Sequence, residues 1–130
     1  MGVATGLLHA TSKYSFVLPN DTPFLSIKIL LLLQDLVEGY DAVIPQWPSG
    51  YLEPLHGIYC TKIASRAARA SIQKGNFRLR HMIEHLGTVL FLSTLTLQQY
   101  DPELLTFYNI NSPDDLNKIS PIFKRQLITT

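Results

Sequence analysis

Polar side chains at the ends of two apolar segments could hold a hard metal ion. Residues 14–18 are rich in strand formers, and Asp21 follows them shortly before a helical pattern. Asp at such a place is most often a turn or helix-cap residue, and that interpretation stays open beside a functional one. Asn109 and Asn111 lie in a later apolar segment, residues 107–111. If both segments are parallel strands that end side by side, their side-chain oxygens suit Mg²⁺, which completes its shell with water and phosphate oxygens.

Two other groups of candidate ligands give weaker indications. His81 and His85 are four residues apart and could share one helical face, as zinc-binding pairs do. The Met-Ile-Glu between them does not match the His-Glu-x-x-His order, and no third ligand is near in the sequence, so a polar helix face is favoured. His9 is interpreted as a surface histidine. Cys60 is the single cysteine, which excludes an internal disulfide and a cysteine-based zinc or iron–sulfur cluster from this chain alone.

The elements that must position these residues alternate between strands and helices. Residues 14–18 predict a strand, residues 26–38 a helix and residues 41–45 a second strand, which together are typical of a right-handed βαβ unit. The predicted buried stripe of that helix consists of Ile27, Leu30, Leu31, Leu33 and Val37. The expected class is therefore α/β, with a mostly parallel sheet and ligands at the carboxyl ends of its strands.

The second half of the chain continues this alternation. A long helix is expected over residues 59–74 and a second one over residues 77–86. The long helix has a face of small residues suited to close packing, which consists of Ala64, Ala67, Ala68 and Ser71. Residues 88–93 predict a third strand, which residues 94–97 extend after a bend, and residues 107–111 predict a fourth.

The composition is that of one globular domain without a strong electrostatic preference. With 130 residues, of which 46% are hydrophobic, we expect one domain over residues 1–120 and a tail over residues 121–130. A formal charge of +1 gives no broad field that would favour nucleic acid or acidic lipid. The most hydrophobic run, residues 27–33, contains Lys28 and is too short for a membrane span, and no secretory signal begins the chain. We therefore expect a cytoplasmic protein.

Three segments resemble the MobA-type nucleotidyltransferases, which include the molybdenum cofactor guanylyltransferases. They are Asn-Asp-Thr-Pro-Phe at residues 20–24, Glu-Pro-Leu-His-Gly-Ile-Tyr at residues 53–59 and Phe-Tyr-Asn-Ile-Asn-Ser-Pro-Asp-Asp-Leu at residues 107–116. Their order is similar to the family pattern of Cys-Asp-x-Pro-Phe, Glu-Pro-Leu and Asn-x-Asn-Thr-Pro-Glu-Asp-Leu. The resemblance covers residues 2–119 and implies a three-layer, Rossmann-like nucleotidyltransferase sheet. It also implies Mg²⁺-dependent transfer of GMP from GTP to molybdopterin-bound molybdenum, with release of pyrophosphate.

The resemblance implies site residues, matched position by position. Asp21 matches the magnesium-binding, catalytic aspartate of the family, and Asn111 is the second expected neighbour of the metal. The residues implied for binding the nucleotide or the acceptor are Gly2, Glu53, His56, Asn109 and Asn111. Among these, Glu53 and His56 belong to a segment on the acceptor side.

The sequence departs from the family pattern at its beginning. The glycine-rich Leu-Ala-Gly-Gly-x-Ser-x-Arg-Met-Gly segment and a following lysine, which hold the base and phosphates in the family, do not occur in it. The resemblance is therefore to the C-terminal part of such an enzyme, without its N-terminal nucleotide-binding strands, and inactivity of the chain alone is expected. A sheet without those strands leaves an edge and an apolar face uncovered, which predicts low stability or a homodimer. Two other interpretations stay open: a non-catalytic module that associates with a molybdopterin-handling protein, and part of a cytidylyltransferase or sugar-nucleotide transferase.

Overall fold

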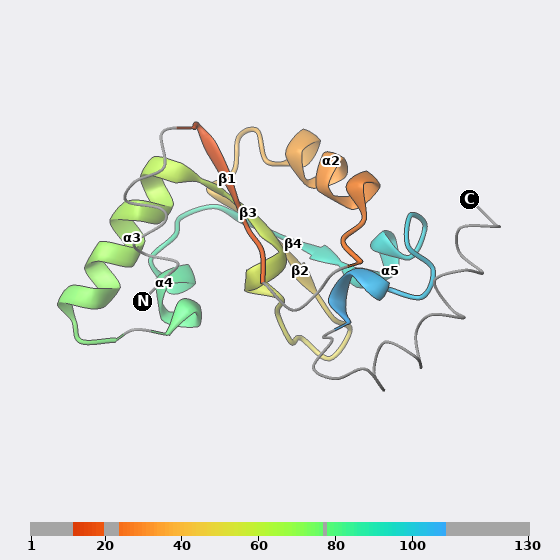
Figure 1. Ribbon diagram of the computed structural model, residues 1–130. Helices are drawn as coiled ribbons and strands as arrows, with labels where there is room; N and C mark the ends of the chain where they lie inside the picture. The colour runs from red at the N-terminus through yellow and green to blue at the C-terminus, as the bar shows by residue number, and fades with distance from the viewer. Residues whose placement is uncertain (1–11, 20–23, 77, 109–130) are drawn as a thin grey trace.

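A four-stranded open sheet forms the centre of the molecule. The computed structural model describes residues 12–19, 24–76 and 78–108. The strands are β1 (Tyr14–Val17), β2 (Ala42–Gln46), β3 (Gly57–Cys60) and β4 (Val89–Ser93), in the spatial order β1-β3-β2-β4 (Figure 1). β1, β2 and β4 run in one direction, because β2 is parallel to β4 and β3 is antiparallel to both of its neighbours. The three strands predicted before residue 94 are confirmed.

Helices cover both faces of the sheet and complete a three-layer α/β fold, as expected. α2 (Ile27–Leu36) and the short α5 (Thr94–Leu97) pack on one face, and α3 (Thr61–Gln73) and α4 (Leu79–Glu84) pack on the other (Figure 1). Because side chains alternate along a strand, β2 contributes to both layers. Ala42 and Ile44 pack with α3 and α4, whereas Val43 packs with α2 and α5.

The buried stripe of α2 differs from the predicted one. Ser26 caps the helix, since its hydroxyl accepts a hydrogen bond from the Ile29 N–H at 3.3 Å. The buried side chains are Ile29, Leu33 and Val37. Leu30 is half-buried, whereas Ile27 and Leu31 are 71% and 55% exposed on the opposite side of the helix. The prediction was wrong at these positions because the run is apolar all round apart from one lysine, so that its pattern indicates no single face.

β3 is a central strand that the sequence pattern does not predict. The pattern predicts a helix from residue 59, but α3 begins at Thr61, and Gly57–Cys60 form a strand instead. β3 lies between β1 and β2, so the first two predicted strands are not neighbours, as they would be in a simple βαβ unit. Gly57 permits this close packing, because a Cβ there would lie 3.1 Å from the Val43 carbonyl oxygen and 3.1 Å from the Tyr59 ring.

The segment after β4 is helical rather than extended. Residues 94–97 form α5 instead of a continued strand, and the 3-10 turn η2 (Leu105–Phe107) occupies the start of the predicted fourth strand. Asp101 holds this turn, since its carboxylate accepts hydrogen bonds from the Leu105 N–H at 3.1 Å and the Thr106 N–H at 2.9 Å. The apolar composition of the segment gives no sign of such a buried cap. The remainder of the predicted strand lies outside the described residues.

α3 packs closely through its small residues, as predicted. The buried residues of this face are Ala64, Ala67, Ala68 and Ser71. α4 is shorter than the helix predicted over residues 77–86, and it buries Met82 and Ile83 in the same core.

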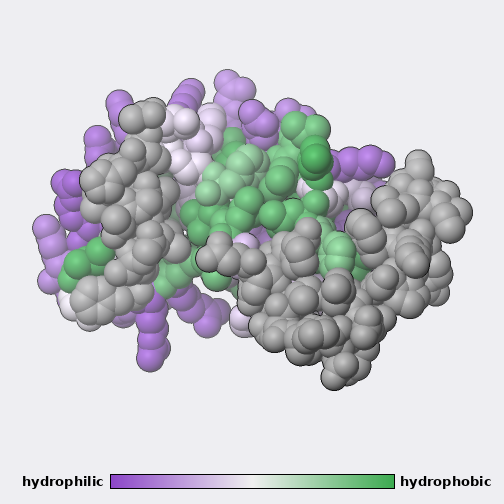
Figure 2. Space-filling model, in the orientation of Figure 1, coloured by the Kyte–Doolittle hydropathy of each residue, from purple (hydrophilic) through white to green (hydrophobic). Residues whose placement is uncertain are grey.

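An apolar surface lies over β1 and α2. Figure 2 shows hydrophobic residues gathered over these elements, whereas the outer side of α3 is hydrophilic. The exposed large apolar side chains there include Phe16, Leu18, Ile27 and Leu31. Among the described strands β1 pairs with β3 alone, and the expected homodimer through this face stays a prediction. Within the described part of the chain, no helix is long and apolar enough to cross a membrane.

Candidate functional site

The carboxyl edge of the sheet holds the two predicted site residues that the structure describes, Glu53 and His56. β1, β2 and β4 end at this edge and β3 begins there, so Glu53 and His56 enter it immediately before β3. Ligands of open α/β folds bind at this edge. Of the predicted site residues, Glu53 and His56 are described, and those outside the described residues are Gly2, Asp21, Asn109 and Asn111.

A tight turn after β2 brings Trp47 and Glu53 together. The Trp47 N–H donates to the Tyr51 carbonyl at 2.8 Å, and the Gly50 N–H donates to the Trp47 carbonyl at 2.8 Å. Gly50 has a φ of +92°, which glycine adopts without the clash that a Cβ would cause. The returning chain pairs with the end of β2, where the Glu53 N–H donates to the Pro45 carbonyl at 2.9 Å. The Trp-Pro-Ser-Gly turn therefore folds back until Glu53 reaches the indole.

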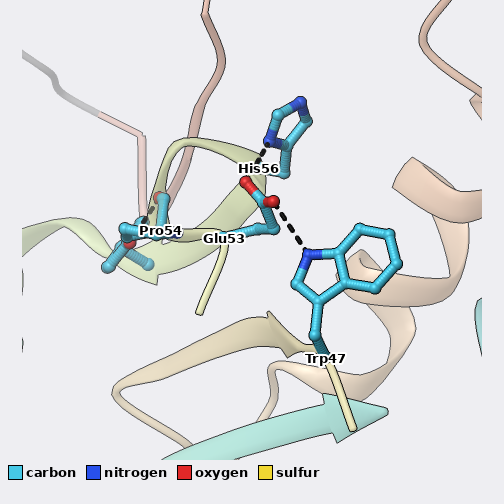
Figure 3. Close-up of polar contacts among 5 residues, drawn as sticks. Trp47, Glu53, Pro54 and His56 are labelled. Carbon is cyan, nitrogen blue, oxygen red and sulfur yellow. Dashed lines mark hydrogen bonds and ion pairs between the residues drawn. The ribbon is translucent and has the colours of Figure 1, made fainter. Parts of the chain in front are cut away.

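Glu53 is a carboxylate held between an indole and an imidazole, as Figure 3 shows. The Trp47 Nε1–H donates to Glu53 Oε1 at 2.8 Å, and His56 Nδ1 lies 3.7 Å from Glu53 Oε2. The second distance is too long for a hydrogen bond, so His56 acts on the carboxylate through proximity and charge. Partial burial acts to raise the pKa of Glu53, but His56 and Trp47 favour the carboxylate and outweigh burial, so the pKa lies below its ordinary value of 4.5. Glu53 is therefore charged at neutral pH.

His56 is a buried imidazole without a hydrogen-bond partner in the described part of the chain. The residue is 8% exposed, and both Nδ1 and Nε2 are unpaired there. The Phe107 ring meets the imidazole in a T-shaped contact with 4.8 Å between ring centroids, and it also lies 5.5 Å from the Trp47 ring. Figure 3 shows the second ring nitrogen on the side away from Glu53. An unpaired buried polar group costs about 1–3 kcal/mol, so the unpaired Nε2 is a cost to the fold that the contact with Glu53 only partly offsets.

The backbone beneath this cluster is fixed by Tyr59. Its fully buried hydroxyl donates to the Pro54 carbonyl at 2.6 Å, and burial raises the pKa of this phenol. Pro54 begins the 3-10 turn η1 (Pro54–His56), in which the His56 N–H donates to the Glu53 carbonyl at 3.1 Å. The turn that carries both site residues is thus tied to β3 by a side chain of that strand.

The exit of β1 passes beside His56. Val17, the last residue of β1, is opposite Gly57, the first residue of β3. Because His56 immediately precedes Gly57, the end of β1 lies beside the backbone of the turn that carries the imidazole, and Asp21 follows Val17 four residues later in the sequence.

The segment directly before Asn109 contacts both His56 and Ser26. Phe107 contacts the His56 ring, and the Thr106 hydroxyl accepts a hydrogen bond from the Ser26 N–H at 3.4 Å. Ser26 follows the short segment that contains Asp21. The described residues on both sides of Asp21, and those directly before Asn109, are therefore held around one corner of the sheet.

The described residues themselves contain no group of three or more His, Cys, Asp or Glu side chains that could hold a metal ion. The rings of His81 and His85 are 4.9 Å apart between centroids. The Ser71 hydroxyl donates its one proton to the Asn76 carbonyl at 2.7 Å. His81 Nδ1 lies 2.9 Å from the Ser71 hydroxyl oxygen and therefore donates a hydrogen bond to it. His81 thus helps α4 to pack on α3, which supports the structural interpretation of this pair.

Trp47 and Phe107 are site residues that the sequence reasoning did not select. Trp47 is the single tryptophan and stands at a strand end beside a Pro-Ser-Gly turn, which is a usable signal for a partner six residues later. Phe107 gave no such signal, since an aromatic residue in an apolar run predicts a strand position equally well.

Comparisons with known proteins identify the family of this chain. The family model of the MobA-like NTP transferase domain matches residues 1–89. The probable molybdenum cofactor guanylyltransferase of Methanosarcina mazei is 35% identical over 118 residues, which are 91% of this chain and 52% of that protein. The molybdenum cofactor guanylyltransferase of Desulfosudis oleivorans is 29% identical over 128 residues, which are 95% of this chain and 60% of that protein.

A solved structure shows the same fold. The crystal structure of molybdopterin-guanine dinucleotide biosynthesis protein A from Archaeoglobus fulgidus matches with a TM-score of 0.76 and 30% identity, covering 95% of this chain and 62% of that one. The chain spans about half the length of the first curated relative. The family match confirms the resemblance over the first two of the three sequence segments, and the chain belongs to the MobA-like NTP transferase family.

Proposed function

We propose that this chain carries the metal- and acceptor-binding part of a magnesium-dependent guanylyltransferase of molybdenum cofactor biosynthesis, acting in the cytoplasm. The reaction transfers GMP from GTP to molybdopterin-bound molybdenum and releases pyrophosphate. Family membership supports nucleotidyl transfer, and the names of the relatives support a guanylyl group and a molybdenum cofactor as the reaction partners.

The observation that carries this proposal is the meeting of two chain segments at His56. β1 ends opposite Gly57, four residues before Asp21 in the sequence, and Phe107 of η2, two residues before Asn109, packs on the imidazole of His56. Segments held around one corner can bring a carboxylate and amide oxygens to a common point. Such a donor set fits a hard divalent cation.

Asp21 and Asn111 would hold Mg²⁺, and Asn109 and Gly2 would contact the nucleotide. When bound, Mg²⁺ stabilises the negative charge that develops on the phosphates during transfer. Glu53 and His56 line the same corner and would face the acceptor.

A calorimetric titration of GTP into the chain, with and without Mg²⁺, tests this function. We expect binding to depend on Mg²⁺ and to fall about tenfold or more in Asp21→Ala, which loses a charged metal ligand. Asp41→Asn is the matched control, because Asp41 caps backbone at the other end of β2. Equal binding by wild type and Asp21→Ala contradicts the metal role, and absent binding by the wild type contradicts GTP binding by this chain.

A further inference from the structure

We propose that His56 binds the phosphate of the acceptor through its Nε2–H, with Glu53 and Trp47 holding the ring in place. This inference rests on the proposed function, because a dinucleotide product requires that the transferred nucleotide be joined to a phosphate group of the acceptor. The ligand class is therefore a phosphate monoester.

His56 has unused hydrogen-bonding capacity. The residue is 8% exposed, and Nε2 has no partner among the residues that the structure describes. Polar groups buried to this extent are nearly always hydrogen-bonded, and the exceptions need an explanation. A ligand oxygen at Nε2 would satisfy that nitrogen, whereas an apolar side chain of similar shape would need no partner at all.

Only one side of the ring is held. Glu53 Oε2 lies 3.7 Å from Nδ1, and the Trp47 Nε1–H fixes the same carboxylate at 2.8 Å. Phe107 packs on the ring in a T-shaped contact. Orientation of an imidazole by a carboxylate on one nitrogen, which leaves the other nitrogen for a ligand, is a common arrangement in binding and catalytic sites.

Glu53 is charged at neutral pH, and a bare carboxylate at this corner would repel a phosphate. Both nitrogens of a protonated imidazole are donors, so a protonated ring between Glu53 and a phosphate would face an anion on each side. His56 thus separates two negative groups that would otherwise destabilise one another.

Phe107, which contacts the His56 ring, lies two residues before Asn109 in the sequence, and Val17, paired with the neighbouring Gly57, lies four residues before Asp21. A phosphate oxygen that attacks a metal-bound nucleotide must lie close to that metal. His56 could hold such a phosphate if Asp21 and Asn111 bind the metal as proposed, because both of them follow closely in sequence on segments that lie near this ring or its backbone.

The test uses inorganic phosphate as the probe and three substitutions of His56. Gln places an amide near the position of Nε2, Asn places one near Nδ1, and Phe keeps the ring without any polar atom. Phosphate binding is followed by the emission of Trp47, the single tryptophan, and by the ring ¹⁵N resonances of histidine. Compared with wild type, we expect the Kd to rise about tenfold or more in His56→Asn and His56→Phe, and about threefold or less in His56→Gln. His85→Asn is the control and should leave the Kd unchanged.

Several outcomes overturn the inference. A common Kd in wild type and all three His56 variants does so, as does a phosphate titration of the wild type in which the His56 resonances do not move. A loss of Mg²⁺ affinity in His56→Asn with unchanged phosphate binding would assign the ring to the metal ligands instead. The Mg²⁺–GTP titration of Asp21→Ala reports separately on the proposed function, so each of the two proposals can fail alone.

Discussion

The two ends of β2 each have a carboxylate nearby, and the two differ in how completely they are bonded. At the amino end, Asp41 Oδ2 accepts hydrogen bonds from the Gly87 N–H at 2.7 Å and the Thr88 N–H at 3.0 Å. At the carboxyl end, Glu53 accepts one bond from Trp47 and faces a histidine ring that is unpaired within the described residues. The carboxylate of Asp41 ties the start of β2 to the backbone just before β4. The carboxylate of Glu53 belongs to a cluster in which the imidazole of His56 lacks hydrogen-bond partners within the described residues, as is common at ligand sites.

The largest effect on stability is expected at the bonded end. Asp41→Ala should lower the free energy of unfolding by about 2 kcal/mol, because two backbone N–H groups lose a charged acceptor. Urea unfolding followed by circular dichroism measures this loss. Asp35→Ala, at an exposed position of α2, is the control and should change little. An equal loss in both variants would show that Asp41 is not a specific cap.

A smaller effect is expected for Glu53→Gln. The amide oxygen can still accept from the Trp47 indole, but the charge that faces His56 is lost, so the unfolding free energy should fall by about 1 kcal/mol. The emission spectrum of Trp47 should shift, because the charge at its N–H is removed. Glu38→Gln, on the surface after α2, should change neither quantity. A loss as large as that of Asp41→Ala would remove the distinction between the two carboxylates.

The pH dependence of stability should separate Glu53 from its amide variant. The folded-state pKa of Glu53 lies below 4.5, so the unfolded state binds this proton first as the pH falls. The stabilisation is complete above the unfolded-state pKa and is lost as the pH falls through the folded-state pKa. Unfolding measured from neutral pH to about pH 3 should therefore bring wild type and Glu53→Gln together at the acid end. Parallel curves over the whole range would contradict the lowered pKa.

The smallest effect, and the most informative sign, is expected for His56→Phe. Because the wild-type ring is unpaired in the described structure, an apolar ring should leave the unfolding free energy within about 1 kcal/mol or raise it. Phosphate affinity should fall in the same variant. Thermal unfolding with and without phosphate measures both quantities on one sample. A loss of more than about 2 kcal/mol would mean that His56 serves the core rather than a ligand.

The sequence predicted the layers of the fold better than the order of its strands. α2, β2 and β4 have clear apolar patterns bounded by Ser26, Pro45 or Gly87, and they were placed correctly. β3 was missed because its four residues run into α3 without any glycine or proline between them. Its position between β1 and β2 depends on tertiary packing around Gly57, which no local pattern records.

The site was predicted through the family resemblance and only in part through physical reasoning. Glu53 and His56 were selected because their segment is similar to a family pattern, and the structure adds the reason they are held together. Trp47 and Phe107 complete the cluster from the end of β2 and from η2, far apart in the chain. Such contacts arise from the fold, so the composition of either segment could not indicate them.

The insertion of β3 also determines the order in which the chain can assemble during synthesis. Ser15 of β1 and Thr61 of α3 join their hydroxyls at 2.7 Å although they are 46 residues apart in sequence. β2 and β3 are joined by a much shorter connection, and closing a short loop costs less entropy than closing a long one. Among the described strands, β1 is therefore made before β3, its partner, and we expect the short β2–β3 connection to close before the long one between β1 and β3. Until β3 is made, β1 has no strand to pair with, and its Phe16 stays exposed even in the folded chain. We therefore expect β1 to be the described strand most open to aggregation during synthesis.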